Sequence, residues 1–232
     1  MRRARALLLA VLAFALVGVG GCSSTPSAST ALPPTERLAA VKKVLDGAGF
    51  VTLSLTSKDV PSGVNGVTAA TGVGAVSATE PRFKGSITGT VKGVAGTVDL
   101  ISIGATAYMK FFTPDYVETN LADLNAPNPS MFFNPDTGVS SLLTAVEEPK
   151  AADPVRSGDE VLDRFTGTLP GSRIQSLFML GDGTGSYQVT FAVTSDDQLR
   201  LATMTGPFFA GATSTYTLRL TGYGTSADIA KP

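Results

Sequence analysis

The chain has 232 residues and a nearly balanced charge, with 18 basic residues against 19 acidic ones. Because it has neither a basic surplus nor a basic cluster, we expect no binding to nucleic acid. It contains no histidine and one cysteine. This excludes Ser-His-Asp and Cys-His catalysis, zinc or copper sites built on nitrogen and sulfur ligands, and an intramolecular disulfide. We therefore expect no metal and no cofactor.

Residues 1–21 have the order of a secretory signal. A basic opening is followed by an apolar stretch over residues 6–17, and small residues then lead to Cys22. The apolar stretch is shorter than the ~20 residues that span a bilayer. A cysteine in this place resembles a lipobox, where the leader is cut and the sulfur receives a diacylglyceryl group. The sequence predicts a lipid anchor at Cys22; an ordinary signal peptide beside an incidental cysteine is the alternative.

Residues 22–34 are rich in serine, threonine and proline and lack core-forming side chains, which is typical of a flexible linker. From Thr35 to Asp46, apolar residues recur at steps of three and four, and this spacing predicts a helix that ends at Gly47. Residues 35–232 are numerous enough for one domain with a sizeable core.

The pattern then changes to alternation of apolar and polar residues, which predicts half-buried strands. Phe83, Ile87 and Val91 share a face with Gly85 and Gly89, and glycines of this kind help a sheet to bend and leave room beside it. Short turns between consecutive strands favour an antiparallel meander. The alternating segments are 51–56, 83–91, 97–100, 108–111, 188–194, 199–201 and 217–221.

Two more helices are predicted, over residues 139–146 and 171–179, and Asp136-Thr137-Gly138 is expected to cap the first of them. Residues 113–135 hold four prolines and several large apolar groups. Loops of this length in a compact domain are usually functional. We therefore interpret this segment as a flap, with Phe132 and Phe133 as the candidates for its entrance.

No residue pattern predicts catalysis. The carboxylate pairs Glu147-Glu148, Asp159-Glu160 and Asp196-Asp197 are adjacent in sequence, so their side chains point in different directions. The segment Gly181–Gly185 lacks the Gly-Lys-Ser/Thr ending of a phosphate loop and is expected to be a turn. Catalytic residues are therefore expected to be absent, and an envelope hydrolase that uses carboxylates alone is a remote alternative.

Three features together carry a resemblance to a known family. They are the lipobox at Cys22, the segment Asn134-Pro135-Asp136-Thr137-Gly138 with Leu142-Leu143 after it, and the ending Leu218–Gly224 with Lys231-Pro232. The chain resembles the LppX/LprAFG lipoproteins of mycobacteria and related actinobacteria, and most closely the LprG type. It departs from that pattern at Tyr223, where a tryptophan is usual, and over residues 171–185.

The resemblance implies an α+β fold in which a single strongly curved antiparallel sheet, a half-barrel, wraps round a few helices, as in the LolA and LolB carriers. It also implies an internal apolar cavity that takes multi-acyl lipids such as glycolipids or triacylglycerol. The protein would be a monomer on the outer face of the cell membrane. It would carry these lipids toward the outer membrane, beside an efflux-type transporter. A pocket larger than ~1,000 Å³, above the range of small-molecule sites, would point to acyl chains.

The cavity lining is expected to come from apolar side chains of the sheet and of the facing helix. The alternative for each of these residues is that it packs in an ordinary core. The alternative for the whole protein is a surface lipoprotein with a packed core that acts as a scaffold or partner for another envelope protein. The candidates are Ile87, Val91, Val98, Leu100, Met109 and Phe111 from the sheet, and Leu142, Leu143 and Val146 from the helix.

Overall fold

The structure, a computed structural model, describes residues 32–111 and 114–232. Residues 32–232 form one compact unit. The predicted signal peptide, the anchor at Cys22 and most of the predicted linker lie outside the described residues. Among the described residues, no helix is both long and apolar enough to cross a membrane.

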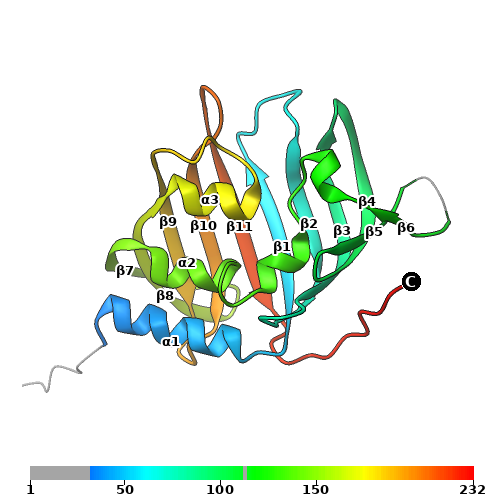
Figure 1. Cartoon of the computed structure of the whole chain (residues 1–232). Coiled ribbons are helices and arrows are strands. Elements are labelled where there is room, and N and C mark those ends of the chain that lie inside the picture. The colour runs from blue at the N-terminus through cyan, green and yellow to red at the C-terminus, as the bar shows by residue number, and fades with distance from the viewer. Residues whose placement is uncertain (1–31, 112–113) are drawn as a thin grey trace, which may run out of the picture. The chain divides into compact units, whose positions relative to one another are not determined.

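Within the described residues, eleven strands form one antiparallel sheet in the order β6-β5-β4-β3-β2-β1-β11-β10-β9-β8-β7 (Figure 1). The strands make two meanders, β1 to β6 and β7 to β11, which meet where β1 pairs with β11. The predicted antiparallel meander is confirmed. The strands are β1 Phe50–Lys58, β2 Gly66–Ala75, β3 Arg82–Val91, β4 Val94–Ile103, β5 Thr106–Lys110, β6 Val117–Thr119, β7 Glu147–Ser157, β8 Glu160–Pro170, β9 Ser186–Val193, β10 Leu199–Phe209 and β11 Ala212–Thr221.

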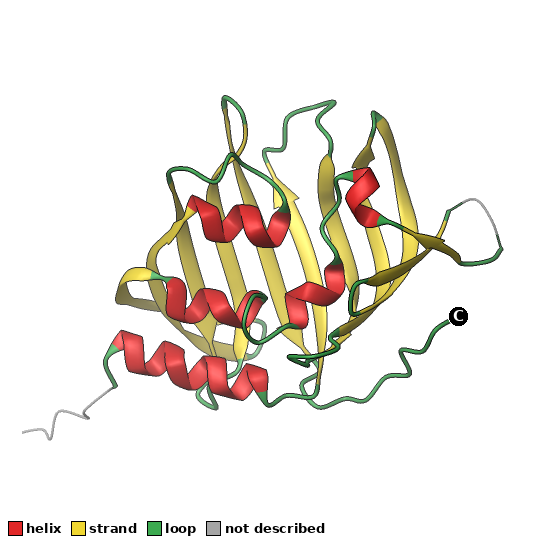
Figure 2. Ribbon diagram, viewed as in Figure 1, coloured by secondary structure: helices red, strands yellow, loops and turns green. Residues whose placement is uncertain are grey.

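The helices gather on one face of the sheet, and the sheet curves round them (Figure 2). Two short 3-10 helices, η1 and η2, lie over the β1 to β4 half, while the three α-helices lie over the β7 to β11 half (Figure 1). The three predicted α-helices are confirmed with ends shifted by one residue at most. The helices are α1 Pro34–Asp46, α2 Val139–Ala145, α3 Gly171–Phe178, η1 Leu121–Leu124 and η2 Pro129–Phe133.

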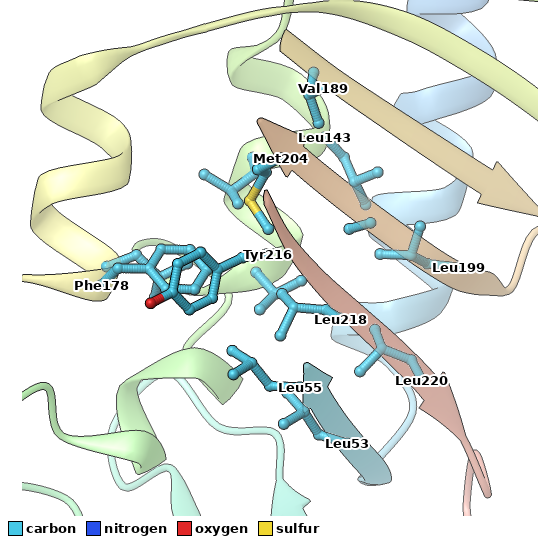
Figure 3. Close-up of a cluster of buried hydrophobic side chains, with 14 of the residues drawn as sticks. Leu53, Leu55, Leu143, Phe178, Val189, Leu199, Met204, Tyr216, Leu218 and Leu220 are labelled. Atoms are coloured by element: carbon cyan, nitrogen blue, oxygen red, sulfur yellow. The ribbon is translucent and has the colours of Figure 1, made fainter. Parts of the chain in front are cut away.

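The core lies between the concave face of the sheet and α2 and α3. Figure 3 shows Leu53 and Leu55 of β1 next to Leu218 and Leu220 of β11, and all four are at most 4% exposed. They occupy facing positions in the register, Leu53 opposite Leu220 and Leu55 opposite Leu218. Facing residues of an antiparallel pair share one side of the sheet, so these four leucines make the concave side of the seam between the two meanders apolar.

The convex face carries a second, smaller cluster. Ile101 of β4, Tyr108 of β5 and Ile229 of the C-terminal tail are buried against one another. The tail is fixed there because the Arg82 guanidinium donates to the Ile229 carbonyl oxygen at 3.0 Å, and the Lys231 ammonium lies 5.6 Å from the centre of the Tyr108 ring. The C-terminal residues therefore cover part of the outer surface of the sheet.

The sequence interpretation missed β2, β7 and β8 and treated residues 113–135 as a loop. β2 consists largely of glycine, alanine and threonine, so its alternation is weak. β7 is an edge strand that carries five charged residues and two prolines, which usually argue against a strand. The 113–135 segment contains β6, η1 and η2.

Candidate functional site

A main cavity lies under the concave face, where β1, β2 and β3 meet the segment that runs from Pro127 to Phe133. Every side chain that lines it is apolar or aromatic. The lining residues are Leu53, Leu55, Val67, Ala70, Phe83, Ile87, Pro127, Pro129, Phe132, Phe133, Phe178, Leu180 and Tyr216.

The Tyr216 hydroxyl is the one polar side-chain group among these residues, and it is already satisfied. It donates to the Val67 carbonyl oxygen at 2.8 Å. Burial raises the pKa of Tyr216 to about 12, so the hydroxyl stays neutral at physiological pH. The main cavity thus offers a guest dispersion contacts and no free side-chain hydrogen bond, which suits a hydrocarbon chain.

The main cavity is small in this structure. The space open to the centre of a water-sized sphere is about 40 Å³, and one water needs about 10–15 Å³ by the same measure. The large hollow that the family resemblance implies is therefore not present between the described residues. Aromatic rings fill it: Phe178 lies between Phe132 at 5.3 Å and Tyr216 at 5.7 Å, measured between ring centres.

A minor cavity of about 10 Å³ lies on the other side of Phe132 and Phe133. Its one polar side chain, Ser140, donates to the Pro135 carbonyl oxygen at 3.3 Å. The minor cavity is therefore also mainly apolar. Its lining residues are Leu45, Leu53, Val76, Phe132, Phe133, Val139, Ser140 and Leu220.

Two of the aromatic rings rest on glycines of the sheet. A Cβ atom on Gly74 would lie 2.3 Å from the Phe133 ring, and one on Gly72 would lie 2.6 Å from the Phe83 ring. The two rings in turn stack on each other, with 6.1 Å between their centres and 19° between their planes. The glycines of β2 thus provide seats into which large apolar groups fit.

Helix η2, which carries both phenylalanines, is fastened to the sheet at its N-terminal end. The Asn128 amide and the Ser130 hydroxyl both donate to the Gly104 carbonyl oxygen at 2.8 Å. The backbone N–H of Ser130 donates to the hydroxyl of Ser102, which is fully buried on β4. These bonds hold the start of the segment that carries Phe132 and Phe133 against the sheet.

The C-terminal end of η2 is fixed by the Asn134–Gly138 motif. The Asn134 side chain donates to Ala78 O and accepts from the N–H groups of Asp136 and Thr137 at 2.9 and 3.1 Å. The residues Asp136-Thr137-Gly138 were expected to cap α2, but no side chain caps it. The expectation was wrong because Asn134 forms a turn ahead of the helix and leaves its first residues uncapped.

The predicted lining residues fall into three groups. Ile87 lines the main cavity, whereas the buried Leu100, Leu142 and Leu143 belong to the core and line neither cavity. The third group is half-buried and also lies outside both linings: Val91, Val98, Met109, Phe111 and Val146.

The half-buried residues of the sheet nevertheless continue the face to which Ile87 belongs. Val98 faces Ile87 across the β3–β4 pair, and Met109 faces Leu100 across β4–β5. The concave face is therefore apolar beyond the edge of the main cavity.

Several lining residues were missed. Leu53, Leu55 and Tyr216 line the main cavity from the seam strands β1 and β11. The alternation of β1 was visible in the sequence, but nothing in it shows which strand will lie under η2. Phe132 and Phe133, which were predicted at the entrance, line both cavities.

Acidic and basic side chains are absent from the linings of both cavities. Among the described residues, no group of three or more Cys, Asp or Glu side chains is placed to hold a metal ion. The Arg200 guanidinium donates to the Glu160 carboxylate at 2.9–3.1 Å, and these hydrogen bonds lower the pKa of Glu160. Asp197 forms an ion pair with Arg37 of α1 at 2.8 Å. These carboxylates fix turns and strands of the domain.

Comparison with known proteins shows the same fold in two mycobacterial lipoproteins. LprF from Mycobacterium bovis has a TM-score of 0.73 at 15% identity, over 86% of this chain and 96% of LprF. LppX from Mycobacterium tuberculosis has a TM-score of 0.62 at 16% identity, over 85% and 98% of the two chains. A LolA superfamily protein from Nitrosomonas europaea reaches a TM-score of only 0.28 at 8% identity, over 83% and 93%.

No curated protein sequence matches the chain. A sequence family does: the model described as LppX_LprAFG lipoprotein matches residues 33–230, which is nearly the whole described unit. The chain therefore belongs to the LppX_LprAFG family of lipoproteins, and its curved antiparallel sheet is the fold that LprF and LppX share.

Proposed function

We propose that the protein binds multi-acyl lipids under the concave face of its sheet and carries them across the aqueous space of the cell envelope. The observation that carries this proposal is the lining of the main cavity, in which no polar side-chain group is left for a guest to bind. Family membership supports it, because the family is one of lipoproteins.

A carrier is physically needed for such cargo. Exposure of a methylene to water costs about 0.8 kcal/mol, so one sixteen-carbon chain costs on the order of 13 kcal/mol. A protein that replaces water with Leu, Ile and Phe side chains lowers this barrier without breaking a bond. The function is accordingly one of binding and transfer rather than catalysis.

The predicted anchor at Cys22 sets where transfer begins. It would hold the domain at the outer face of the plasma membrane, and the linker would let the domain reach away from it. We propose that lipid moves from this membrane toward the outer membrane or cell surface, with a membrane transporter of the efflux type as partner.

The small volume of the main cavity favours a second candidate, a packed domain that serves as a scaffold for another envelope protein. The two functions differ in what the protein carries when it is isolated without detergent. Mass spectrometry of the isolated protein is expected to find bound acyl lipid. A protein purified from its native envelope that holds none would support the scaffold.

A substitution in the cavity gives a second test. We expect Ile87→Trp to abolish loading with acyl lipid, because an indole at this position fills the main cavity. Thr88→Trp is the matched control, since Thr88 bonds to Thr97 on the exposed convex face. Lipid content per protein is measured for both variants, with circular dichroism to confirm that they fold. Equal loading of the Ile87→Trp variant and its control would contradict this binding site.

A further inference from the structure

The main and minor cavities are parts of one space that is divided by two side chains. Phe132 and Phe133 line both cavities, and Leu53 of β1 is the third residue that they share. Leu53 belongs to the central seam of the sheet, whereas the two rings project from η2. Among the described residues, Phe132 and Phe133 therefore form the partition between the cavities.

The two rings are held differently. Phe132 is half-buried and meets the edge of Phe178, with 83° between the ring planes. Phe133 is 6% exposed, stacks on Phe83 and sits on the seat at Gly74. Phe133 is thus the more deeply seated ring, and it resists displacement more strongly than Phe132.

On the far side of Phe132 and Phe133, the minor cavity provides further apolar surface that an acyl chain could contact. The minor cavity is bordered by Leu45 of α1, Val139 of α2 and Leu220 of β11. The backbone around the partition is fixed by the hydrogen bonds of Asn128 and Asn134. Access from one cavity to the other therefore depends on rotation of the rings more than on movement of η2 as a whole.

We propose that Phe133 determines how long an acyl chain the protein accepts. This inference rests on the proposed function. A chain that enters the main cavity passes Phe132 and then meets Phe133. Its next methylenes reach Leu45 and Val139 only when the Phe133 ring leaves its seat on Gly74. Burying those methylenes makes the free energy of binding more favourable, but displacing a buried ring costs free energy. Because the two effects offset each other, affinity stops rising with chain length.

The test measures binding of saturated fatty acids, from octanoate to stearate, to the compact unit of residues 32–232. Displacement of fluorescent cis-parinaric acid gives the dissociation constants. For the unaltered unit, we expect affinity to rise by about fourfold for each added methylene and then to level off. With Phe133→Ala, the rise is expected to continue through longer acids. Phe133→Leu, which keeps an apolar side chain and so protects folding, is expected to move the plateau by a smaller step.

Phe165→Ala is the matched control. Phe165 is also 6% exposed but lies on β8 and lines neither cavity, so this variant should keep the original plateau. The inference is overturned if both Phe133 variants level off at the same chain length as the unaltered unit, or if Phe165→Ala shifts the plateau equally. Failure of every acid to bind the unaltered unit would instead overturn the proposed function, and this inference with it.

Discussion

Gly138 lies where three backbone carbonyl groups converge. A Cβ atom there would be 2.5–2.6 Å from the carbonyl oxygens of Phe132, Asn134 and Met131. These oxygens belong to the backbone and cannot rotate away. The turn that joins η2 to α2 therefore requires glycine at this position because of close approach.

We expect Gly138→Ala to lower the free energy of unfolding by about 3 kcal/mol, the upper part of the usual range for inserting a methyl group into a packed site. Gly47→Ala is the control: Gly47 has an ordinary φ of −89°, and its nearest contact would be 3.4 Å. Urea denaturation of both variants measures the difference. Equal midpoints would show that the turn can relax.

The Asn134–Gly138 motif illustrates what a sequence reveals at the residue scale. The motif could be identified as the most family-specific segment, but its role was interpreted as a helix cap. Its contacts are with Ala78 and with the carbonyl groups of η2, and α1 reaches it as well, since the Lys42 ammonium donates to Pro135 O at 2.7 Å. These partners are distant in sequence or depend on a 3-10 helix that has no clear periodicity.

At the scale of the element, η2 is stabilised by side chains more than by its own backbone. Asn128 accepts from the Ser130 N–H, accepts from the Ser130 hydroxyl and donates to Gly104 O. Five residues in a 3-10 helix supply few backbone hydrogen bonds of their own. The position of Phe132 and Phe133 over the sheet is therefore set by one asparagine at the start of the helix and another at its end.

We expect Asn128→Ala to lower the free energy of unfolding by about 1–2 kcal/mol, because its bonds to Ser130 and Gly104 are lost together. It should also speed amide exchange at Ser130. Asn120→Ala is the comparison, since Asn120 caps η1 through one bond to the Ala122 N–H. Hydrogen exchange that is equally fast in both variants would show that Asn128 does not fix η2.

The same scale shows why part of the sheet could be predicted and part could not. Strands with a large apolar residue at every second position, such as β1 and β9, were identified from their alternation. β2 uses Gly72 and Gly74 where another strand would place large side chains, because the Phe83 and Phe133 rings occupy that space. The glycines that make room for the rings at the candidate site therefore also remove the apolar alternation by which β2 could have been predicted.

For the whole molecule, the buried Tyr216 and the half-buried Tyr223 link stability to alkaline pH. Burial raises the pKa of Tyr216 to about 12 and also raises that of Tyr223, whose hydroxyl donates to Leu199 O. An unfolded tyrosine has a pKa of about 10. Because the folded state holds these protons more tightly, their contribution to stability is complete below about pH 10 and is lost as the pH rises toward 12.

We therefore expect the thermal midpoint of the domain to fall steeply above about pH 10. The Tyr216→Phe variant should be less stable at neutral pH, because its hydrogen bond to Val67 O is gone. It should lose less stability on going to high pH. Thermal denaturation across the alkaline range checks both parts. Parallel curves for the two proteins would mean that Tyr216 ionises freely in the folded state.

The cavities could not be predicted at this scale, although the family could. An apolar face was visible in the sequence, but alternation alone does not distinguish an empty space from one filled by rings. Phe132, Phe178 and Tyr216 come from η2, α3 and β11, and only the folded arrangement brings them together.

The pairing of β1 with β11 joins the two ends of the folding unit at the middle of the sheet. Each meander can form from strands that are neighbours in the sequence. The leucine seam between the two meanders cannot form until the final strand is present. Contacts this distant along the chain slow folding. A chain that ends before residue 212 therefore keeps the other strands of both meanders but lacks β11, the strand that pairs one meander with the other.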